Sequence, residues 1–262
     1  MEKTAFYEEM VGRNIGVLTA KEQERLKNTC IAVAGCGGMG GLSAEQLVRL
    51  GVGHVKIADP DIFAVHNLSR QCCSTTSNIG QNKAEVLERH FKQINPHLKL
   101  DVFTEGVLPG NVERFIDGAA VVIDGTDLSS LDATLAMYRA AQKNNICVVS
   151  PNAIGFGVNV FVFGPKTVSL EKFLGLSAGV DVRMAMTKLV PYVPSYVDPE
   201  LIRKAAMGEM YIPNIVMPQY FGTSIAVTEA VMMVLGKVNP PEGPAPRLFI
   251  MDLLDRKFEV TG

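Results

Sequence analysis

The stretch that decides the fold class of this chain is Cys30-Ile-Ala-Val-Ala-Gly-Cys-Gly-Gly-Met-Gly-Gly41. Residues 31–34 are a short apolar run typical of a buried strand, and apolar residues recur at helical spacing after the glycines. A strand, a glycine turn and a helix in this order are typical of a nucleotide phosphate site, because glycines let phosphates approach the backbone and the helix start offers free N–H groups. We therefore expect four glycines to bind a nucleotide: Gly35, Gly37, Gly38 and Gly40.

A second apolar strand predicts both an acid for a ribose and a parallel sheet. Val55-Lys-Ile-Ala-Asp59 ends in a carboxylate about twenty residues after the glycine turn, where dinucleotide-binding units place the side chain that holds a ribose hydroxyl. The strand–helix–strand unit of residues 30–59 needs a crossover connection, which predicts parallel strands covered by helices. We expect an α/β, Rossmann-like fold: a mostly parallel twisted sheet with helices on both faces and an antiparallel C-terminal extension.

The rest of the chain predicts further strands, helices and a proline-rich segment within a single domain. Strands are expected at 98–103, 119–124, 147–150 and 158–163, the last of them antiparallel, with a hairpin at 247–252 and 258–260. Helices are expected at 82–91, 111–116, 131–143 and 222–235. We divide the domain into a helical N-terminal arm (1–28), a nucleotide-binding core (29–164), a proline-rich crossover (165–220), and a C-terminal helix and hairpin (221–262).

The composition is typical of a soluble globular protein and gives no sign of a nucleic-acid or membrane surface. Of the 262 residues, 47% are hydrophobic and 20% are charged, and the formal net charge is −2. The first residues lack the apolar core of a signal peptide, and no apolar stretch reaches the ~18 residues that span a bilayer. We expect a cytoplasmic protein with no membrane partner, and nucleic acid is a disfavoured partner because surfaces that bind it are usually basic.

The cysteines and histidines do not indicate a structural metal site. The chain has five cysteines and four histidines, and no cysteine pair has CxxC spacing. Cys30 and Cys147 lie in apolar runs, where a small buried side chain is the more common role. Cys72 and Cys73 adjoin the polar segment described next, and we favour a passive role for them. The sequence therefore predicts no zinc site and no disulfide framework.

Polar side chains beyond the glycine turn favour chemistry at a phosphoryl group over hydride transfer. Amides, cations and carboxylates follow the strands that end at Asp59 and at residue 124: Asn67, Arg70, Gln71, Lys83, Asp124 and Asp127. Because the carboxyl ends of parallel strands meet at one edge of a sheet, we expect Asp59 and residues 124–127 to converge on the edge that carries the glycine turn. Cations and a carboxylate able to hold Mg²⁺ offset the charge that builds on phosphate oxygens during attack.

These motifs resemble the ubiquitin-activating-enzyme-like adenylyltransferases of the ThiF/MoeB/HesA type. The resemblance covers about residues 8–164 and rests on motifs at compatible spacings: Gly35-Cys-Gly-Gly-Met-Gly40, Asp59-Pro-Asp61, Asn67-Leu-Ser-Arg-Gln71, Gly80-Gln-Asn-Lys83, Ile94-Asn-Pro96 and Asp124-Gly-Thr-Asp127. It implies that MgATP and a carboxylate react to an acyl-adenylate and pyrophosphate. The implied substrate is the C-terminus of a ubiquitin-like or sulfur-carrier protein, or of a peptide.

The resemblance also implies roles for the residues around the nucleotide. Asp59 would hold the ribose, and Gln71 would support the loop. The phosphates would be contacted by Asn67, Arg70 and Lys83.

Four further residues complete the predicted site. Asp127 would bind Mg²⁺, and Arg13, near a helix junction, is similar to an arginine that family members donate across a homodimer interface. The implied enzyme is therefore a homodimer with Arg13, Arg70, Lys83 and Asp127 as its catalytic residues. Two carboxylates keep alternative interpretations, because Asp61 either faces the ligand or is structural, and Asp124 either binds the nucleotide or caps the turn after its strand.

The chain departs from the family pattern in ways that limit the chemistry. Many members carry two CxxC pairs for zinc, but this chain has none, and no cysteine follows Cys147. The usual Asp-Asn at the magnesium position is Asp127-Leu128 here. We therefore expect adenylation without a covalent thioester or persulfide step through a crossover cysteine.

The sequence is also compatible with three alternative functions. The family includes a dehydratase that cyclises threonylcarbamoyladenosine in tRNA, so the activated carboxylate could be carried by a tRNA, although the near-neutral charge argues mildly against it. The glycine motif alone would also suit an NAD- or FAD-dependent oxidoreductase. The altered Asp127-Leu128 pair leaves room for a non-catalytic partner subunit.

Overall fold

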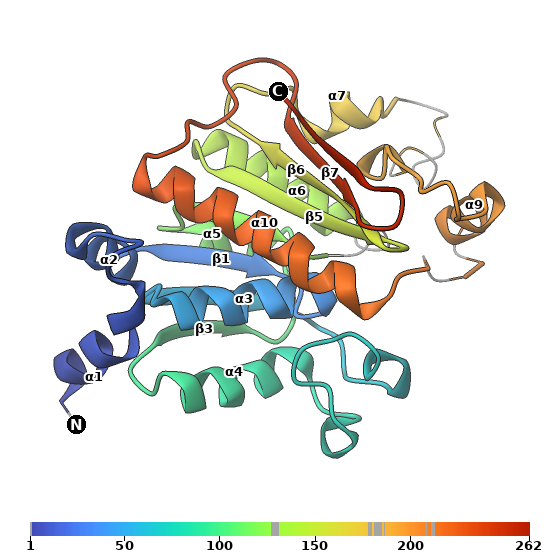
Figure 1. The fold of residues 1–262 in the computed structure, drawn as a ribbon. Helices are drawn as coiled ribbons and strands as arrows, with labels where there is room; N and C mark the ends of the chain where they lie inside the picture. The colour runs from blue at the N-terminus through green and yellow to red at the C-terminus, as the bar shows by residue number, and fades with distance from the viewer. Residues whose placement is uncertain are drawn as a thin grey trace.

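One eight-stranded sheet runs through the molecule (Figure 1). The computed structural model describes residues 2–126, 131–177, 180, 185, 187–207, 209–210 and 213–262. The strands are β1 (Cys30–Ala34), β2 (His54–Ala58), β3 (Lys99–Phe103), β4 (Val121–Asp124), β5 (Cys147–Ile154), β6 (Gly157–Phe163), β7 (Arg247–Asp252) and β8 (Lys257–Thr261). They lie in the order β3-β2-β1-β4-β5-β6-β7-β8, so the C-terminal hairpin extends the same sheet that contains β1.

The first five strands form the parallel part of the sheet. β1 pairs in parallel with β2 on one side and with β4 on the other, and the ladder continues to β3 and β5. The chain therefore winds outward first to one side and then to the other, and the reversal lies between β1 and β4. In doubly wound sheets, ligands bind at such a reversal, outside the carboxyl ends of the strands. The predicted Rossmann-like class is confirmed.

The last three strands are antiparallel, as the sequence predicts. β6, β7 and β8 each pair antiparallel with the preceding strand in the sheet. β5 is longer than expected, because it continues past residue 150 through Pro151 and pairs with β6 as far as Ile154. β4 pairs with β5 only up to Val149, so Pro151 lies where no strand accompanies β5 on that side, a position in which a missing N–H is tolerated.

Helices cover both faces of the sheet. They are α1 (Lys3–Met10), α2 (Ala20–Lys27), α3 (Gly38–Leu50), α4 (Lys83–Ile94), α5 (Val112–Ile116), α6 (Leu131–Lys143), α7 (Leu170–Leu174), α9 (Pro199–Ala206) and α10 (Val216–Leu235). α3, α4 and α10 share one apolar core with Ile31 and Val33 of β1, while α5, α6 and α7 share another with Ala32 and Ala34. The alternation along β1 thus gives each face its own core.

The C-terminal helix begins earlier than the sequence predicts. The expected start is residue 222, but α10 begins at Val216 and includes Pro218 in its first turn. Proline is compatible with a first helical turn, because the N–H that it lacks would have no partner there. The extra turn brings Gln219 to the carboxyl-end edge of the sheet, where Gly38 lies.

The proline-rich crossover packs beside the C-terminal half of the sheet. Val190, Val197 and Ile202 form a small apolar cluster with Ile154 at the end of β5. The hydroxyl of Tyr196 donates to the buried carboxylate of Asp252, at 2.8 Å. This crossover is therefore attached to the sheet through β5 and the β7–β8 turn. None of the helices in the described part of the chain has both the length and the apolar character needed to cross a membrane.

Candidate functional site

The glycine turn between β1 and α3 has no room for a side chain at Gly35 or Gly40. Gly35 has φ +84°, and a Cβ there would overlap the carbonyl oxygen of Gly125, which follows β4. A Cβ at Gly40 would overlap the carbonyl oxygen of Gly35. Gly37 is the N-cap of α3 and supplies no side chain to cap the first N–H groups. Those N–H groups and the helix dipole make this end of α3, at the sheet reversal, suited to an anion.

Asp59 joins the glycine turn to the turn after β2. Its side chain is 5% exposed, and its two oxygens accept the backbone N–H groups of Cys36 at 2.6 Å and Asp61 at 2.8 Å. Burial raises the pKa of the Asp59 carboxyl above its usual value, while the charge of Lys83 and the two N–H donors oppose that rise. Each carboxylate oxygen keeps a second lone pair, so Asp59 can still accept a hydroxyl donor such as a ribose.

Lys83 brings a buried positive charge to the same place. It is the first residue of α4, where the side chain of Asn82 caps the helix by accepting the N–H of Glu85. Only 6% of Lys83 is exposed, and its Nζ lies 2.8 Å from the Asp61 carboxylate. The structure therefore brings Asp59, Asp61 and Lys83 together. Of the two interpretations of Asp61, the ion pair supports a structural role in holding Lys83.

The segment of residues 64–74 contacts the glycine turn through Gln71, whose side chain lies beside Gly37. Asn67 is 3% exposed, and its side-chain oxygen accepts the N–H of Ala64 at 2.8 Å, while its carbonyl accepts the N–H of Arg70 and of Gln71. Arg70 Nη1 donates to the carbonyl of His66 at 3.1 Å. Asn67 thus fixes the shape of the segment that carries Arg70.

The side chain of Gln71 lies against the glycine turn. A Cβ built on Gly37 would be 3.5 Å from Gln71 Nε2. Its Oε1 atom is buried and has no hydrogen-bond donor among the described residues. A buried acceptor without a donor is costly, so this oxygen is free to accept a hydrogen bond. This position is compatible with the predicted support of the loop.

Asp124 is turned into the protein. It is 4% exposed, and its oxygens accept from the Thr126 N–H and hydroxyl and from the Tyr138 hydroxyl, the last at 2.9 Å. These contacts favour the capping role over nucleotide binding, the two interpretations that the sequence left open. Asp127, the predicted Mg²⁺ ligand, lies outside the described residues and stays a prediction.

We expect Asp124→Asn and Asp255→Asn to respond to pH in opposite directions. Burial raises the pKa of Asp124, so the native state favours its protonated form and wild-type stability falls as pH rises from about 4 through that raised pKa. Hydrogen bonds from Tyr192 and Ser195 lower the pKa of Asp255, so its contribution is present above about pH 4 and is lost as pH falls.

Urea unfolding midpoints across that pH range measure both effects. The advantage of the wild type over Asp124→Asn should shrink with rising pH, while its advantage over Asp255→Asn should grow. Equal slopes for the two variants would contradict the assigned burial of Asp124.

Gln219 of α10 is a site residue that the sequence did not reveal. It is 2% exposed, and its side-chain oxygen lies so close to Gly38 that a Cβ on this glycine would overlap it. On the next turn of α10, the Thr223 hydroxyl accepts a 2.7 Å hydrogen bond from Gln46 of α3. The sequence pattern places residue 219 in the proline-rich crossover, before the expected helix start at residue 222, and nothing in that local pattern indicates that its side chain contacts Gly38.

The loss of stability in Gly38→Ala should be partly reversed by a second substitution, Gln219→Ala. The nearest atoms to a Cβ on Gly38 all belong to the Gln219 side chain, whereas a Cβ on Gly40 meets backbone. Shortening Gln219 therefore makes room at position 38 but not at position 40. Melting temperatures of the single and double variants should give a favourable coupling for the first pair and none for Gly40→Ala with Gln219→Ala. If the changes in melting temperature were simply additive for both pairs, the contact between Gly38 and Gln219 would be contradicted.

Among the predicted site residues that the structure describes, Arg13 lies far from the glycine turn. It is exposed in a 3₁₀ turn, and the neighbouring Asn14 donates to the carbonyl of Leu50 at 3.1 Å. Leu50 ends α3, so about 18 Å of helix separates this region from Gly38. Arg13 therefore does not join the site within one chain, and its donation across a dimer stays a prediction.

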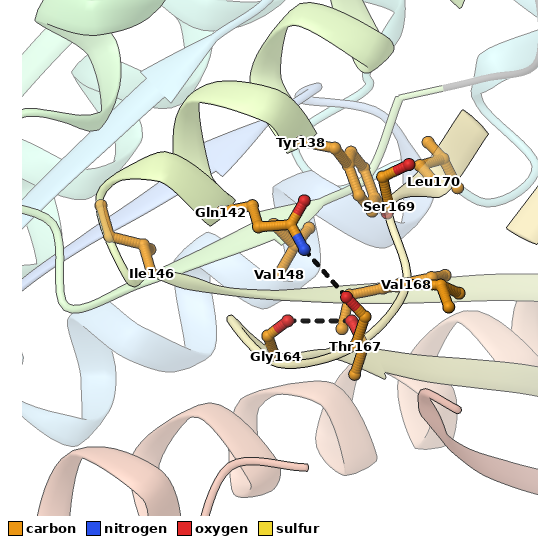
Figure 2. A pocket seen from close by; sticks show the side chains of 10 residues that line it. Tyr138, Gln142, Ile146, Val148, Gly164, Thr167, Val168, Ser169 and Leu170 are labelled. Atoms are coloured by element: carbon orange, nitrogen blue, oxygen red, sulfur yellow. Dashed lines mark hydrogen bonds between the residues drawn. The ribbon is translucent and has the colours of Figure 1, made fainter. Parts of the chain in front are cut away.

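A separate pocket lies between α6 and residues 163–170 (Figure 2). The Gln142 side chain donates to the Thr167 carbonyl at 2.8 Å, and the Thr167 hydroxyl donates to the Gly164 carbonyl. Ile146 and Gly164 place this pocket at the amino end of β5, the sheet edge opposite the glycine turn. Its ten lining residues are uncharged, so it offers no cation to a phosphate.

The chain is similar to a known protein family over nearly its whole length. The model of the ThiF family matches residues 11–261. The chain belongs to the ThiF family. The family resemblance that the motifs indicated is therefore confirmed, and the match extends through the crossover and the C-terminal hairpin.

Two bacterial relatives show the kinds of protein that this ThiF-family chain is similar to. The tRNA threonylcarbamoyladenosine dehydratase of Escherichia coli (strain K12) is 36% identical over 126 residues, which cover 48% of this chain and 46% of the relative. The sulfur carrier protein ThiS adenylyltransferase of the same organism is 29% identical over 143 residues, covering 55% of this chain and 56% of the relative. The chain therefore matches about half the length of these curated relatives.

A solved structure supports the fold over a greater length. The crystal structure of the E. coli tRNA N6-threonylcarbamoyladenosine dehydratase in complex with ATP has a TM-score of 0.64 and 22% sequence identity. The similarity covers 90% of this chain and 98% of that chain. At this identity the likeness establishes a shared fold, and the activity has to be argued from the site.

Proposed function

We propose that this ThiF-family protein uses ATP to adenylate a carboxylate and releases pyrophosphate. The observation that carries the proposal is the buried Lys83, whose Nζ lies 2.8 Å from Asp61. The charge of Lys83 also acts on Asp59, the acceptor of the Cys36 N–H in the glycine turn. Burying an ammonium group is costly unless an opposite charge compensates it, so a buried lysine at this position indicates a role for its positive charge. A triphosphate needs such a cation, because negative charge on its oxygens grows as pyrophosphate leaves.

The proposed reaction is one displacement at the α-phosphorus of ATP. A carboxylate oxygen of the substrate forms a new bond to this phosphorus, the bond to the bridging oxygen of the β-phosphate breaks, and pyrophosphate departs with the electron pair. Lys83 and Arg70 would offset the charge on the phosphates, and Asp59 would accept a ribose hydroxyl. Mg²⁺, for which Asp127 is the predicted ligand, would add two further positive charges beside the phosphates when bound.

The substrate that we favour is the C-terminus of a ubiquitin-like or sulfur-carrier protein or of a peptide. The relative named for the sulfur carrier ThiS supports this class. The relatives named for threonylcarbamoyladenosine in tRNA support the second candidate, a carboxylate carried by a tRNA. The net charge of −2 favours the first class, because tRNA binding usually requires an excess of basic residues.

The test is ATP–pyrophosphate exchange by the purified protein with MgATP and each class of carboxylate. Exchange that depends on a carrier protein or peptide supports the favoured substrate, and exchange that depends on tRNA supports the second candidate. Calorimetric titration with ATP, AMP and NAD⁺ provides the control. Tight binding of NAD⁺ in preference to ATP would sink the adenylation proposal, and ATP binding without any exchange would favour a non-catalytic subunit.

We also propose that the active form is a homodimer in which Arg13 reaches the partner's site. Arg13→Ala and Lys83→Ala should each lose most of the exchange activity, yet a mixture of the two should regain it. In a heterodimer one site would carry both defects and the other would carry neither, so random mixing should restore about a quarter of the wild-type sites. A mixture as inactive as its components, with dimers confirmed by light scattering, would contradict the shared site.

A further inference from the structure

A cluster of four side chains of metal-ligating types includes two cysteines that lie just after Arg70 in the chain. Glu45 comes from α3 and His90 from α4, while Cys72 and Cys73 directly follow Gln71. One ligand atom from each of the four lies within 4.8 Å of every other. The cluster is formed by three separate segments, and it shares no residue with the proposed nucleotide site.

The separations within the cluster are close to those of a tetrahedral metal site. Zinc bonds of about 2.0–2.3 Å place neighbouring ligand atoms about 3.3–3.8 Å apart. The sulfur atoms of Cys72 and Cys73 are 3.4 Å apart, and His90 Nε2 lies 3.4 Å from Glu45 Oε2. The thiol of Cys72 donates a hydrogen bond to Glu45 Oε2 at 2.7 Å. If both groups bound the same cation, their bonds to that cation would replace this hydrogen bond.

The surroundings hold these ligand atoms in place. Arg49 Nε binds the other oxygen of Glu45 at 2.7 Å, which leaves Oε2 facing the cysteines and the histidine. Neighbouring side chains of an extended chain point to opposite sides. Cys73 instead has φ +62°, a conformation that is uncommon for residues other than glycine, and the two sulfur atoms meet on one side. The side chain of His90 is 32% exposed, so a cation can reach the cluster from solvent.

We propose that Glu45, Cys72, Cys73 and His90 bind a divalent cation of the zinc class. Two thiolates and an imidazole select a borderline-soft cation over Mg²⁺ or Ca²⁺, which prefer oxygen ligands. With four protein ligands the site would be closed and therefore structural. This proposal revises the expectation of no zinc site, which rested on CxxC spacing, and it does not depend on the proposed function.

The bound cation would fix the phosphate-contacting segment to the helices behind it. Arg70, Gln71 and Cys72 are consecutive in the chain. The side chain of Gln71 lies against Gly37. Metal bonds would join this segment to α3 and α4 at once. Binding would require the two thiols to release their protons, so uptake of Zn²⁺ should be accompanied by proton release.

The experiment is metal binding by the full chain after treatment with a chelator. Titration with Co²⁺ should give a thiolate-to-metal absorption band and the visible bands of a tetrahedral site at one equivalent. Zn²⁺ should displace the cobalt and raise the melting temperature of the protein. The paired substitution Cys72→Ser with Cys73→Ser should abolish the thiolate band.

Two single variants keep the proposal testable if the double cysteine variant fails to fold. His90→Ala should weaken Zn²⁺ binding by more than the roughly tenfold to hundredfold that loss of an outer-sphere partner costs. His97→Ala, at the exposed turn after the same helix, should bind like the wild type. The proposal is overturned if Co²⁺ gives no thiolate band, or if His90→Ala and His97→Ala bind Zn²⁺ with equal affinity.

Discussion

Lys83→Ala should lower the rate of ATP–pyrophosphate exchange by roughly 10²- to 10³-fold, the range found when one group that stabilises a transition-state charge is removed. The ammonium of Lys83 is buried beside Asp61, and its charge opposes the rise that burial causes in the pKa of Asp59. Its removal would take a cation from the phosphates. Asp59 and Asp61 would also lose the positive charge that now lies beside them. Exchange at saturating ATP, together with the affinity for ATP, measures the loss.

Lys92→Ala is the matched control for Lys83→Ala. Lys92 lies on the same helix, nine positions further on, and its Nζ donates to the carbonyl of Leu98 at 2.7 Å. Its removal takes away an equal charge far from the glycine turn, so exchange should stay within about twofold of the wild type, as is typical of a surface substitution. Exchange that is unaffected in Lys83→Ala, or reduced equally in both variants, would refute the role of Lys83.

Gly40→Ala should destabilise the protein, although alanine is the better helix former. Helix propensity alone predicts a gain of about 1 kcal/mol for this substitution inside α3. The new Cβ would, however, overlap the backbone carbonyl oxygen of Gly35, and no side-chain rotation can relieve that contact. A loss of roughly 3 kcal/mol or more should follow, and for a chain of this size it corresponds to a fall in melting temperature of roughly 6–12 °C.

Gly110→Ala is the control for Gly40→Ala. A Cβ on Gly110 has no atom within 4 Å, and this residue does not have a left-handed backbone conformation. Its substitution should change stability by no more than about 0.5 kcal/mol. A melting temperature of Gly40→Ala at or above that of the wild type would show that the turn opens more easily than the packing indicates.

Much of the fold could be predicted because its signals are local. The apolar run of residues 31–34, the glycines after it and the helical spacing beyond them lie within one continuous stretch. Periodicity and turn chemistry act between near neighbours in the chain, so they can be identified without knowledge of the packing. The same holds for α4, which the sequence places at residues 82–91 and which begins at Lys83, one residue later.

The functional edge of the sheet could also be anticipated, although individual orientations could not. Parallel strands bring their carboxyl ends together, so Asp59 and the residues after β4 were expected near the glycine turn. Whether Asp124 faces a ligand or the protein depends on what packs behind it. Tyr138 of α6 supplies the hydrogen bond that turns this carboxylate inward.

The sequence alone therefore established the α/β class, the glycine turn and the group of cations and carboxylates near it. The contact of Gln219 with Gly38 and the meeting of Glu45 and His90 with the two cysteines became visible in the folded chain. These residues are distant in sequence and share no spacing rule. Their proximity follows from how α3, α4 and α10 pack on one face of the sheet, and that packing is set by the whole core rather than by any local pattern.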